Sequence, residues 1–143
     1  MSVRSFVASA MLVLLCLPGC GNSPTAPGTS VDVAGSWTGT WQFVTSGVTV
    51  TDTVTASITQ SGTSAAGSWT AASGASGNLT FTARSTISGT ATINQTTING
   101  FACSGSTTMS GTASSSSLDF SLGTLTQSGA CQWATGNQFS LKK

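Results

Sequence analysis

Very few side chains in this chain could carry out acid–base or nucleophilic chemistry near neutral pH. The 143 residues include no histidine, glutamate or tyrosine, and the carboxylate side chains are Asp32, Asp52 and Asp119. Without histidine and glutamate, a Ser-His-Asp arrangement, a histidine metal site and a glutamate acid–base pair are excluded. Asp119 lies between Leu118 and Phe120 in an alternating pattern, so we expect it to point outward. We therefore predict a protein that is not an enzyme and needs no metal or cofactor.

Charged residues are too few to attract a highly charged partner. They make up 5% of the chain, and the formal net charge is +1 at pH 7. After residue 20, the three aspartates are balanced by Arg84, Lys142 and Lys143. The sequence has no basic stripe, which excludes nucleic acid as a partner.

The cysteine at position 20 ends an apolar leader. Residues 1–5 contain one positive charge, and residues 6–17 form an apolar run that is too short to span a bilayer. The run ends in Leu17-Pro18-Gly19-Cys20, which resembles the lipobox of bacterial lipoprotein signal peptides, with an aliphatic residue three positions before the cysteine and a small residue directly before it. The resemblance implies a helical signal peptide over residues 1–19 and a lipid anchor on Cys20. An ordinary secretory signal that happens to contain a cysteine is the alternative.

A lipidated Cys20 would place the protein in a bacterial cell envelope. Each buried methylene contributes about 0.8 kcal/mol, so two or three acyl chains would hold the protein on a membrane. Gly21, rather than aspartate, follows the cysteine, which in lipoproteins of double-membraned bacteria implies sorting to the outer membrane. Residues 20–32 are polar and contain proline, as in a disordered tether, and residues 33–143 are expected to form one folded domain and a monomer.

The folded part is predicted to consist of β-strands. In residues 37–43, Trp37, Trp41 and Phe43 alternate with threonine and glutamine, so an extended backbone places the rings on one face. Residues 48–59 alternate in the same way, with Val48, Val50, Val54, Ala56 and Ile58 on one face. Turn signals recur about every ten residues, and one later stretch is expected to run through Ile98, Phe101 and Cys103. The pattern predicts an all-β domain of about eight to ten antiparallel strands.

The scarcity of edge protection favours a closed sheet. Open sheets guard their edges with charge, proline or bulges, but no proline follows Pro27 and charges are rare. Closing the sheet removes the edges. We therefore predict a small up-and-down β-barrel, with a β-sandwich as the alternative.

The start of the first long strand resembles known ligand-binding barrels. Gly35-Ser36-Trp37 resembles the Gly-x-Trp that opens lipocalins and related calycin barrels, and Gly39-Thr40-Trp41 is similar to avidin-like barrels. Both families bind small molecules inside an eight-stranded barrel. In lipocalins a basic residue after the last strand packs over the first tryptophan, and Lys142 is placed to do this. Tyrosine is missing, so the Thr-Asp-Tyr motif of lipocalins is absent.

A ligand cavity in such a barrel would be walled by tryptophans. The candidate residues are Trp37, Trp41, Trp69, Trp133 and Asp52. The alternative for the tryptophans is plain core packing. For Asp52 the alternative is a hairpin loop, with the strand starting at Thr53.

Cys103 and Cys131 are the remaining cysteines beyond the leader. Outside the cytoplasm, two cysteines in a small β domain are expected to form a disulfide. A redox or metal pair is the alternative, but the chain has neither a Cys-x-x-Cys spacing nor a histidine to support it.

Two functions fit these features. The first is a membrane-anchored envelope lipoprotein that binds a small apolar or amphipathic ligand inside the barrel without catalysis. The second is a structural or protein-interaction barrel with a filled core, similar to small barrel lipoproteins that inhibit proteases, which meets another envelope protein through its outer face or loops.

Overall fold

The computed structural model describes residues 29–45, 48–98, 101–128 and 136–143, and all structural statements below concern these residues. Within them the chain forms nine β-strands and no helix. The strands are β1 (Gly35–Thr45), β2 (Val48–Ser61), β3 (Ser64–Ala71), β4 (Ser76–Thr82), β5 (Thr86–Ile98), β6 (Phe101–Ala113), β7 (Ser117–Leu122), β8 (Thr126–Ser128) and β9 (Gln138–Lys142). The predicted signal peptide and most of the predicted tether lie outside the described residues.

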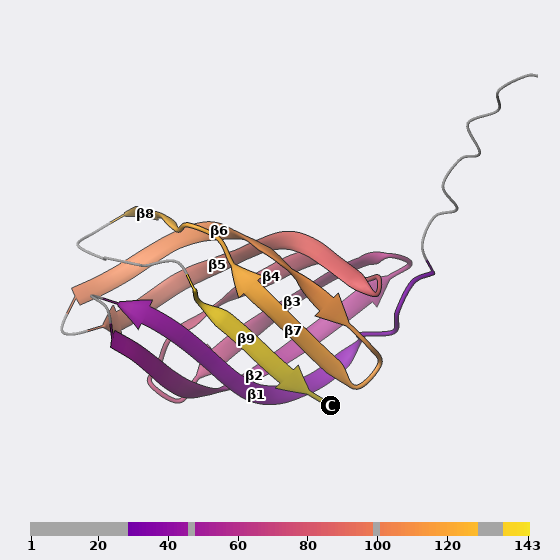
Figure 1. Ribbon diagram of the computed structural model, residues 1–143, viewed down its shortest axis with the longest axis horizontal. Coiled ribbons are helices and arrows are strands. Elements are labelled where there is room, and N and C mark those ends of the chain that lie inside the picture. Colours follow the sequence, from indigo (N-terminus) through magenta and orange to yellow (C-terminus); the bar gives the residue numbers. More distant parts are fainter. Residues whose placement is uncertain (1–28, 46–47, 99–100, 129–135) are drawn as a thin grey trace, which may run out of the picture.

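Eight of the strands close into an antiparallel up-and-down barrel (Figure 1). From β1 to β7, each strand pairs with the next along the chain, and β9 closes the ring by pairing with both β7 and β1. The short strand β8 pairs with the first half of β6, outside the ring. The predicted all-β barrel is confirmed, and the sandwich alternative is not what the chain forms.

Strands β7 and β8 run along one partner in succession. Leu122 at the end of β7 pairs with Met109, and Thr126 at the start of β8 pairs with Ser106. Thr126 comes four positions after Leu122, but their partners on β6 are only three positions apart. The chain therefore carries one extra residue between β7 and β8. Such a bulge bends a strand, and β8 accordingly leaves the ring, so that β9 pairs with β7 and β1 and not with β8.

The interior is built from the apolar face of each strand, as alternation requires. The largest fully buried apolar side chains are Trp37, Trp41, Trp69, Phe139, Leu79, Ile93, Leu118, Leu141, Val33 and Val54.

The predicted apolar face of β2 is buried only in part. Val54, Ala56 and Ile58 are buried, but Val48 and Val50 are 59% and 38% exposed. The pairing of β2 with β3 begins at Val54, so the tip of the β1–β2 hairpin extends beyond the next strand. The core therefore ends earlier along β2 than the alternation indicates.

Inward-facing glycines let the strands approach one another closely. A Cβ atom at Gly39 would collide with the carbonyl oxygen of Ser140, and one at Gly111 would collide with the carbonyl oxygen of Asp119. Both collisions involve backbone atoms, which cannot move aside without shifting a strand. Gly111 lies opposite Phe120, so a residue without a side chain leaves room for a ring in a narrow barrel.

The segment before β1 packs across one end of the barrel. The backbone N–H of Val31 donates to Ala83 (3.1 Å), and the side chain of Gln60 donates to the Val31 carbonyl (2.9 Å) and accepts from the Val33 N–H (2.7 Å). Val33 is fully buried, and its carbonyl accepts from Trp37 Nε1 (2.9 Å). This end of the barrel is therefore covered by Val31, from the end of the predicted tether, and by Val33, the first residue of the predicted domain.

Candidate functional site

Aromatic rings from several strands meet inside the barrel. The Trp69 and Phe139 ring centroids lie 5.2 Å apart in an edge-to-face arrangement, and the Phe139 and Phe120 rings stack at 4.9 Å. Trp41 lies 5.2 Å from Trp69 and 5.7 Å from Phe139. Because β3 and β9 are separated by β2 and β1 in the sheet, the contact between Trp69 and Phe139 crosses the interior. At this level the barrel is filled by side chains.

The predicted wall residues occupy two places in this interior. Trp41 and Trp69 belong to the cluster of rings, whereas Trp37 lies toward the end that Val33 covers. All three are at most 1% exposed. Trp133 lies outside the described residues. The described tryptophans therefore pack in the core. A role for them in ligand binding stays a prediction.

A lysine packs over Trp37, but it is the neighbour of the one predicted. Lys143 Nζ lies 5.4 Å from the centre of the Trp37 ring, at a distance suited to a cation–π interaction. Leu141 on β9 faces the core, so Lys142 points outward by alternation. Lys143 lies after the end of the strand, where the chain can turn over the barrel's end.

The indole N–H of Trp69 is unusual because it is buried without a partner. Its nitrogen makes no hydrogen bond to any described residue. Gly77 lies opposite Trp69 on β4, and a Cβ atom there would come within 2.7 Å of that nitrogen. The glycine therefore provides the space for the indole. An unpaired buried donor costs about 1–3 kcal/mol.

Asp52 lies inside strand β2, so the hairpin-loop interpretation is wrong. It pairs with Trp41, and its carboxylate accepts a hydrogen bond from the Ser73 N–H (3.0 Å) in the β3–β4 turn. Burial acts to raise the pKa of Asp52, but hydrogen bonds from Ser73 and from the Thr53 backbone outweigh it, and the pKa lies below its usual value. The carboxylate is thus held charged at the rim of the barrel and stabilises the neighbouring turn.

Two of the three predicted cysteine sites lie outside the described residues. Cys20 and Cys131 lie outside the described residues, while the backbone of Cys103 pairs with Thr96 between β5 and β6. The lipid anchor and the disulfide therefore remain predictions. Among the described residues, no group of histidine, cysteine or acidic side chains could hold a metal ion. The same part of the chain has no helix long and apolar enough to cross a bilayer.

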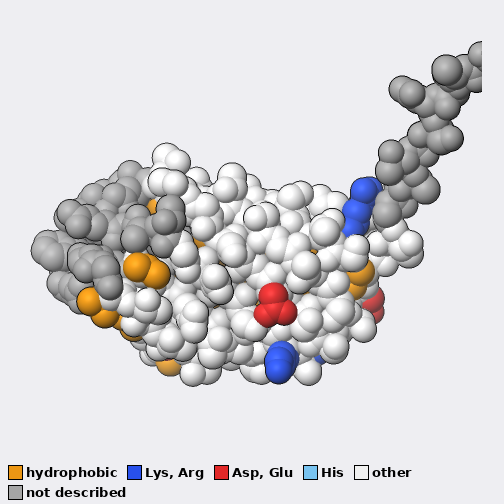
Figure 2. All heavy atoms as spheres, in the orientation of Figure 1, with side chains coloured by type: hydrophobic (Ala, Val, Ile, Leu, Met, Phe, Trp, Pro, Cys, Tyr) orange, Lys and Arg blue, Asp and Glu red, His pale blue; other side chains and the backbone are white. Residues whose placement is uncertain are grey.

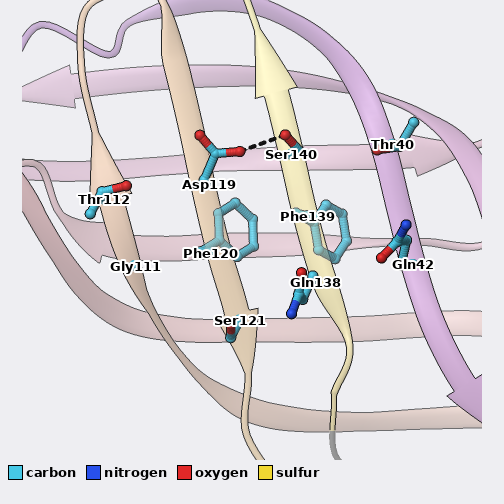
Figure 3. Close-up of a pocket in the computed structure, with 10 residues that line it drawn as sticks. All are labelled: Thr40, Gln42, Gly111, Thr112, Asp119, Phe120, Ser121, Gln138, Phe139 and Ser140. Atoms are coloured by element: carbon cyan, nitrogen blue, oxygen red, sulfur yellow. Dashed lines mark hydrogen bonds between the residues drawn. The ribbon is translucent and has the colours of Figure 1, made fainter.

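The outer wall of the barrel carries mostly small, uncharged polar side chains, and on the face shown in Figure 2 few charged groups lie among them. Four strands, β1, β9, β7 and β6, frame a groove of about 350 Å³ on this wall (Figure 3). We call it the outer groove. Its outward side chains are Thr40, Gln42, Thr112, Asp119, Ser121, Gln138 and Ser140.

The strand register orders these side chains in two rows. Thr40, Ser140, Asp119 and Thr112 form one row of paired residues, and Gln42, Gln138 and Ser121 form the next. The Ser140 hydroxyl donates to Asp119 (2.5 Å), as the dashed line in Figure 3 shows.

Alternation along the strand correctly predicts that Asp119 points outward, but it does not reveal this groove. The outward position of Gln42 could be read from the alternation in β1. That it lies beside Gln138 could not, because the two residues come from opposite ends of the chain.

Asn137 is a further residue that the sequence did not single out. It is buried, its side-chain oxygen accepts from the Val44 N–H (2.9 Å), and its carbonyl accepts from the Leu122 N–H (2.8 Å). It thereby fixes the start of β9 between the ends of β1 and β7, which supports the outer groove.

No protein-family model, curated protein or solved structure matches this chain.

Proposed function

We propose that this protein is a non-catalytic binding module of a bacterial envelope, anchored by lipid on Cys20, that binds its partner through the outside of a filled barrel. The observation that carries the proposal is the contact of Trp69 with Phe139 across the interior (5.2 Å). Rings that meet across a barrel occupy the space in which a lipocalin-like barrel would hold a ligand. The outer wall, in contrast, offers grooves lined by polar side chains.

The anchor proposed at Cys20 would also orient the barrel. The described chain enters the barrel at the end that Val31 and Val33 cover, and nine residues separate Cys20 from Ser30. Nine residues span at most about 30 Å. The covered end would therefore face the membrane, and the side walls, including the outer groove, would remain open to partners.

A change of Cys20 to alanine tests the anchor. We expect the unchanged protein to fractionate with membranes and its N-terminal peptide to carry the mass of acyl chains, because lipidation requires this thiol. Cys16→Ala is the matched control and should leave the protein on membranes. Release of neither variant, or of both, would contradict the proposed anchor.

A second candidate function is the binding of a small apolar or amphipathic ligand inside the barrel. The buried Nε1 of Trp69 supports it, because this donor has no partner among the described residues and could hydrogen-bond to a bound molecule. Titration with fatty acids, retinoids and biotin-like compounds separates the two functions by tryptophan fluorescence. A filled barrel should give no saturable change, whereas saturable quenching that is lost in Trp69→Phe would favour the interior site.

A further inference from the structure

We propose that the outer groove binds a neutral saccharide. This inference rests on the proposed function, since it names the partner class for the outer wall. It is carried by the number of hydrogen-bonding groups that the groove gathers and by their chemistry, since all of the outward groups except the Asp119 carboxylate are uncharged.

The groove presents an ordered grid of polar groups. Side chains paired on adjacent strands have Cβ atoms about 4.5–5.5 Å apart, and the two rows lie about 7 Å apart along the strands. Figure 3 shows Gln42 and Gln138 on neighbouring strands on one side, and Asp119 with Ser140 on the other. A ligand in the groove can therefore contact several polar side chains from both rows at once.

Most of these groups make no hydrogen bond to another residue that the structure describes. Among the described residues, the side chains of Gln42, Gln138 and Ser121 make no hydrogen bond, and all three are exposed or line the groove openly. On another part of the wall, the hydroxyls of Thr55 and Thr70 are hydrogen-bonded to each other (3.0 Å). The outer groove thus gathers several hydrogen-bonding groups that no other described side chain occupies.

The chemistry of these groups matches a polyol. Each glutamine amide offers both donors and an acceptor, and the Asp119 carboxylate offers acceptors only. Because the Ser140 hydroxyl donates to Asp119, its oxygen can accept from a ligand. Sugar hydroxyls both donate and accept, so they can satisfy all of these groups.

Other partner classes fit less well. A phosphate or another anion would meet the Asp119 carboxylate, and none of the described residues that line the groove is a lysine or an arginine. A protein partner usually buries aromatic or other large apolar anchors, but the outward side chains of the groove are all polar. The rings of Phe120 and Phe139 lie behind the strands in the core, so the groove has no stacking surface. We therefore expect weak binding, with Kd in the millimolar range.

The test is a titration of the whole mature protein with oligosaccharides, in a detergent without a sugar headgroup. Binding is monitored by the amide chemical shifts in NMR spectra. The probes are cellotriose, maltotriose and triacetylchitotriose. We expect saturable shifts for at least one probe, confined to β1, β9, β7 and the end of β6. Gln138→Ala and Asp119→Asn should each weaken binding about tenfold.

Asn78→Ala is the matched control, because Asn78 is an exposed amide in the groove formed by β2, β3 and β4. It should leave the affinity unchanged. Saturable shifts that are absent for all three probes, or an Asn78→Ala effect equal to that of Gln138→Ala, would overturn the saccharide proposal. Both results leave outer-wall binding standing, since that proposal fails only if the fluorescence titration reveals a ligand inside the barrel.

Discussion

The same substitution at two buried tryptophans should have very different costs. Trp37 and Trp69 are each 1% exposed, but Trp37 Nε1 donates to the Val33 carbonyl (2.9 Å) whereas Trp69 Nε1 has no partner among the described residues. Replacing each with phenylalanine removes the N–H and part of the ring. The two variants therefore share a packing cost and differ in the hydrogen bond.

The packing cost can be estimated first. Aromatic side chains bury about 150–250 Å² each, so a change from tryptophan to phenylalanine removes about 50 Å² of buried area, or about 1 kcal/mol. A remaining cavity of about 40 Å³ adds about 1 kcal/mol. At Trp37 the loss of a donor to Val33 adds about 1–3 kcal/mol, whereas at Trp69 the removal of an unpaired donor returns a similar amount. We expect Trp37→Phe to cost about 4 kcal/mol and Trp69→Phe about 0 kcal/mol.

Urea unfolding of both variants, followed by circular dichroism, measures this difference. Similar unfolding slopes would show that the comparison concerns the folded state. Equal losses of stability in the two variants would refute the reasoning. They would mean that the Trp69 N–H is hydrogen-bonded in the purified protein, and a molecule bound inside the barrel would then become the first explanation to test.

Three further predictions concern other parts of the chain. The pKa of Asp52 is lowered by folding, so its contribution to stability is present above the unfolded-state pKa and is lost as the pH falls through the folded-state value; Asp52→Asn should flatten the acid limb of the urea midpoint against pH. Gln60→Ala removes the side-chain hydrogen bonds that hold the segment before β1, so it should lower the free energy of unfolding by about 1–3 kcal/mol and speed hydrogen exchange at the Val33 amide. An unchanged exchange rate would contradict the proposed role of Gln60 in holding this segment. Cys103 and Cys131 should resist alkylation until a reductant is added, and mass spectrometry of both thiols freely labelled in the native protein would exclude the disulfide.

The barrel could be predicted because its determinants are local. Alternation in single strands gives the buried faces, and the scarcity of proline and charge indicates a sheet without free edges. One hairpin was missed at this level. Ile98 and Phe101 were expected in one stretch, but they end β5 and begin β6 and pair with each other. The dipeptide Asn99-Gly100 between them is a strong hairpin signal that the sequence interpretation did not use.

The contacts that shape the outer groove depend on register across the whole chain. Gln42 meets Gln138, and Val44 bonds to Asn137, only after β9 has joined β1. Alternation predicts that Gln42 points outward, but it cannot say which outward residue from the far end of the chain will lie beside it. The prediction that Lys142 packs over Trp37 is wrong for a related reason: Lys143 takes that place, and the path of the chain after the last strand is not encoded in a strand pattern.

Closure of the barrel and formation of the outer groove are thus the same structural event. The groove lies across the seam where β9, from the C-terminal end, enters between β1 and β7. Before β9 pairs with β1 and β7, the row that contains Thr40 and Asp119 would lack Ser140, and the row that contains Gln42 and Ser121 would lack Gln138. Neither row could then hold a ligand across the strands. Pairing over such a sequence distance is slow to form, because the entropy of a long loop must be lost before the contacts stabilise it. A ligand of the outer groove would therefore bind only the closed barrel and would stabilise it by mass action, linking binding on the outside to the packing of rings within.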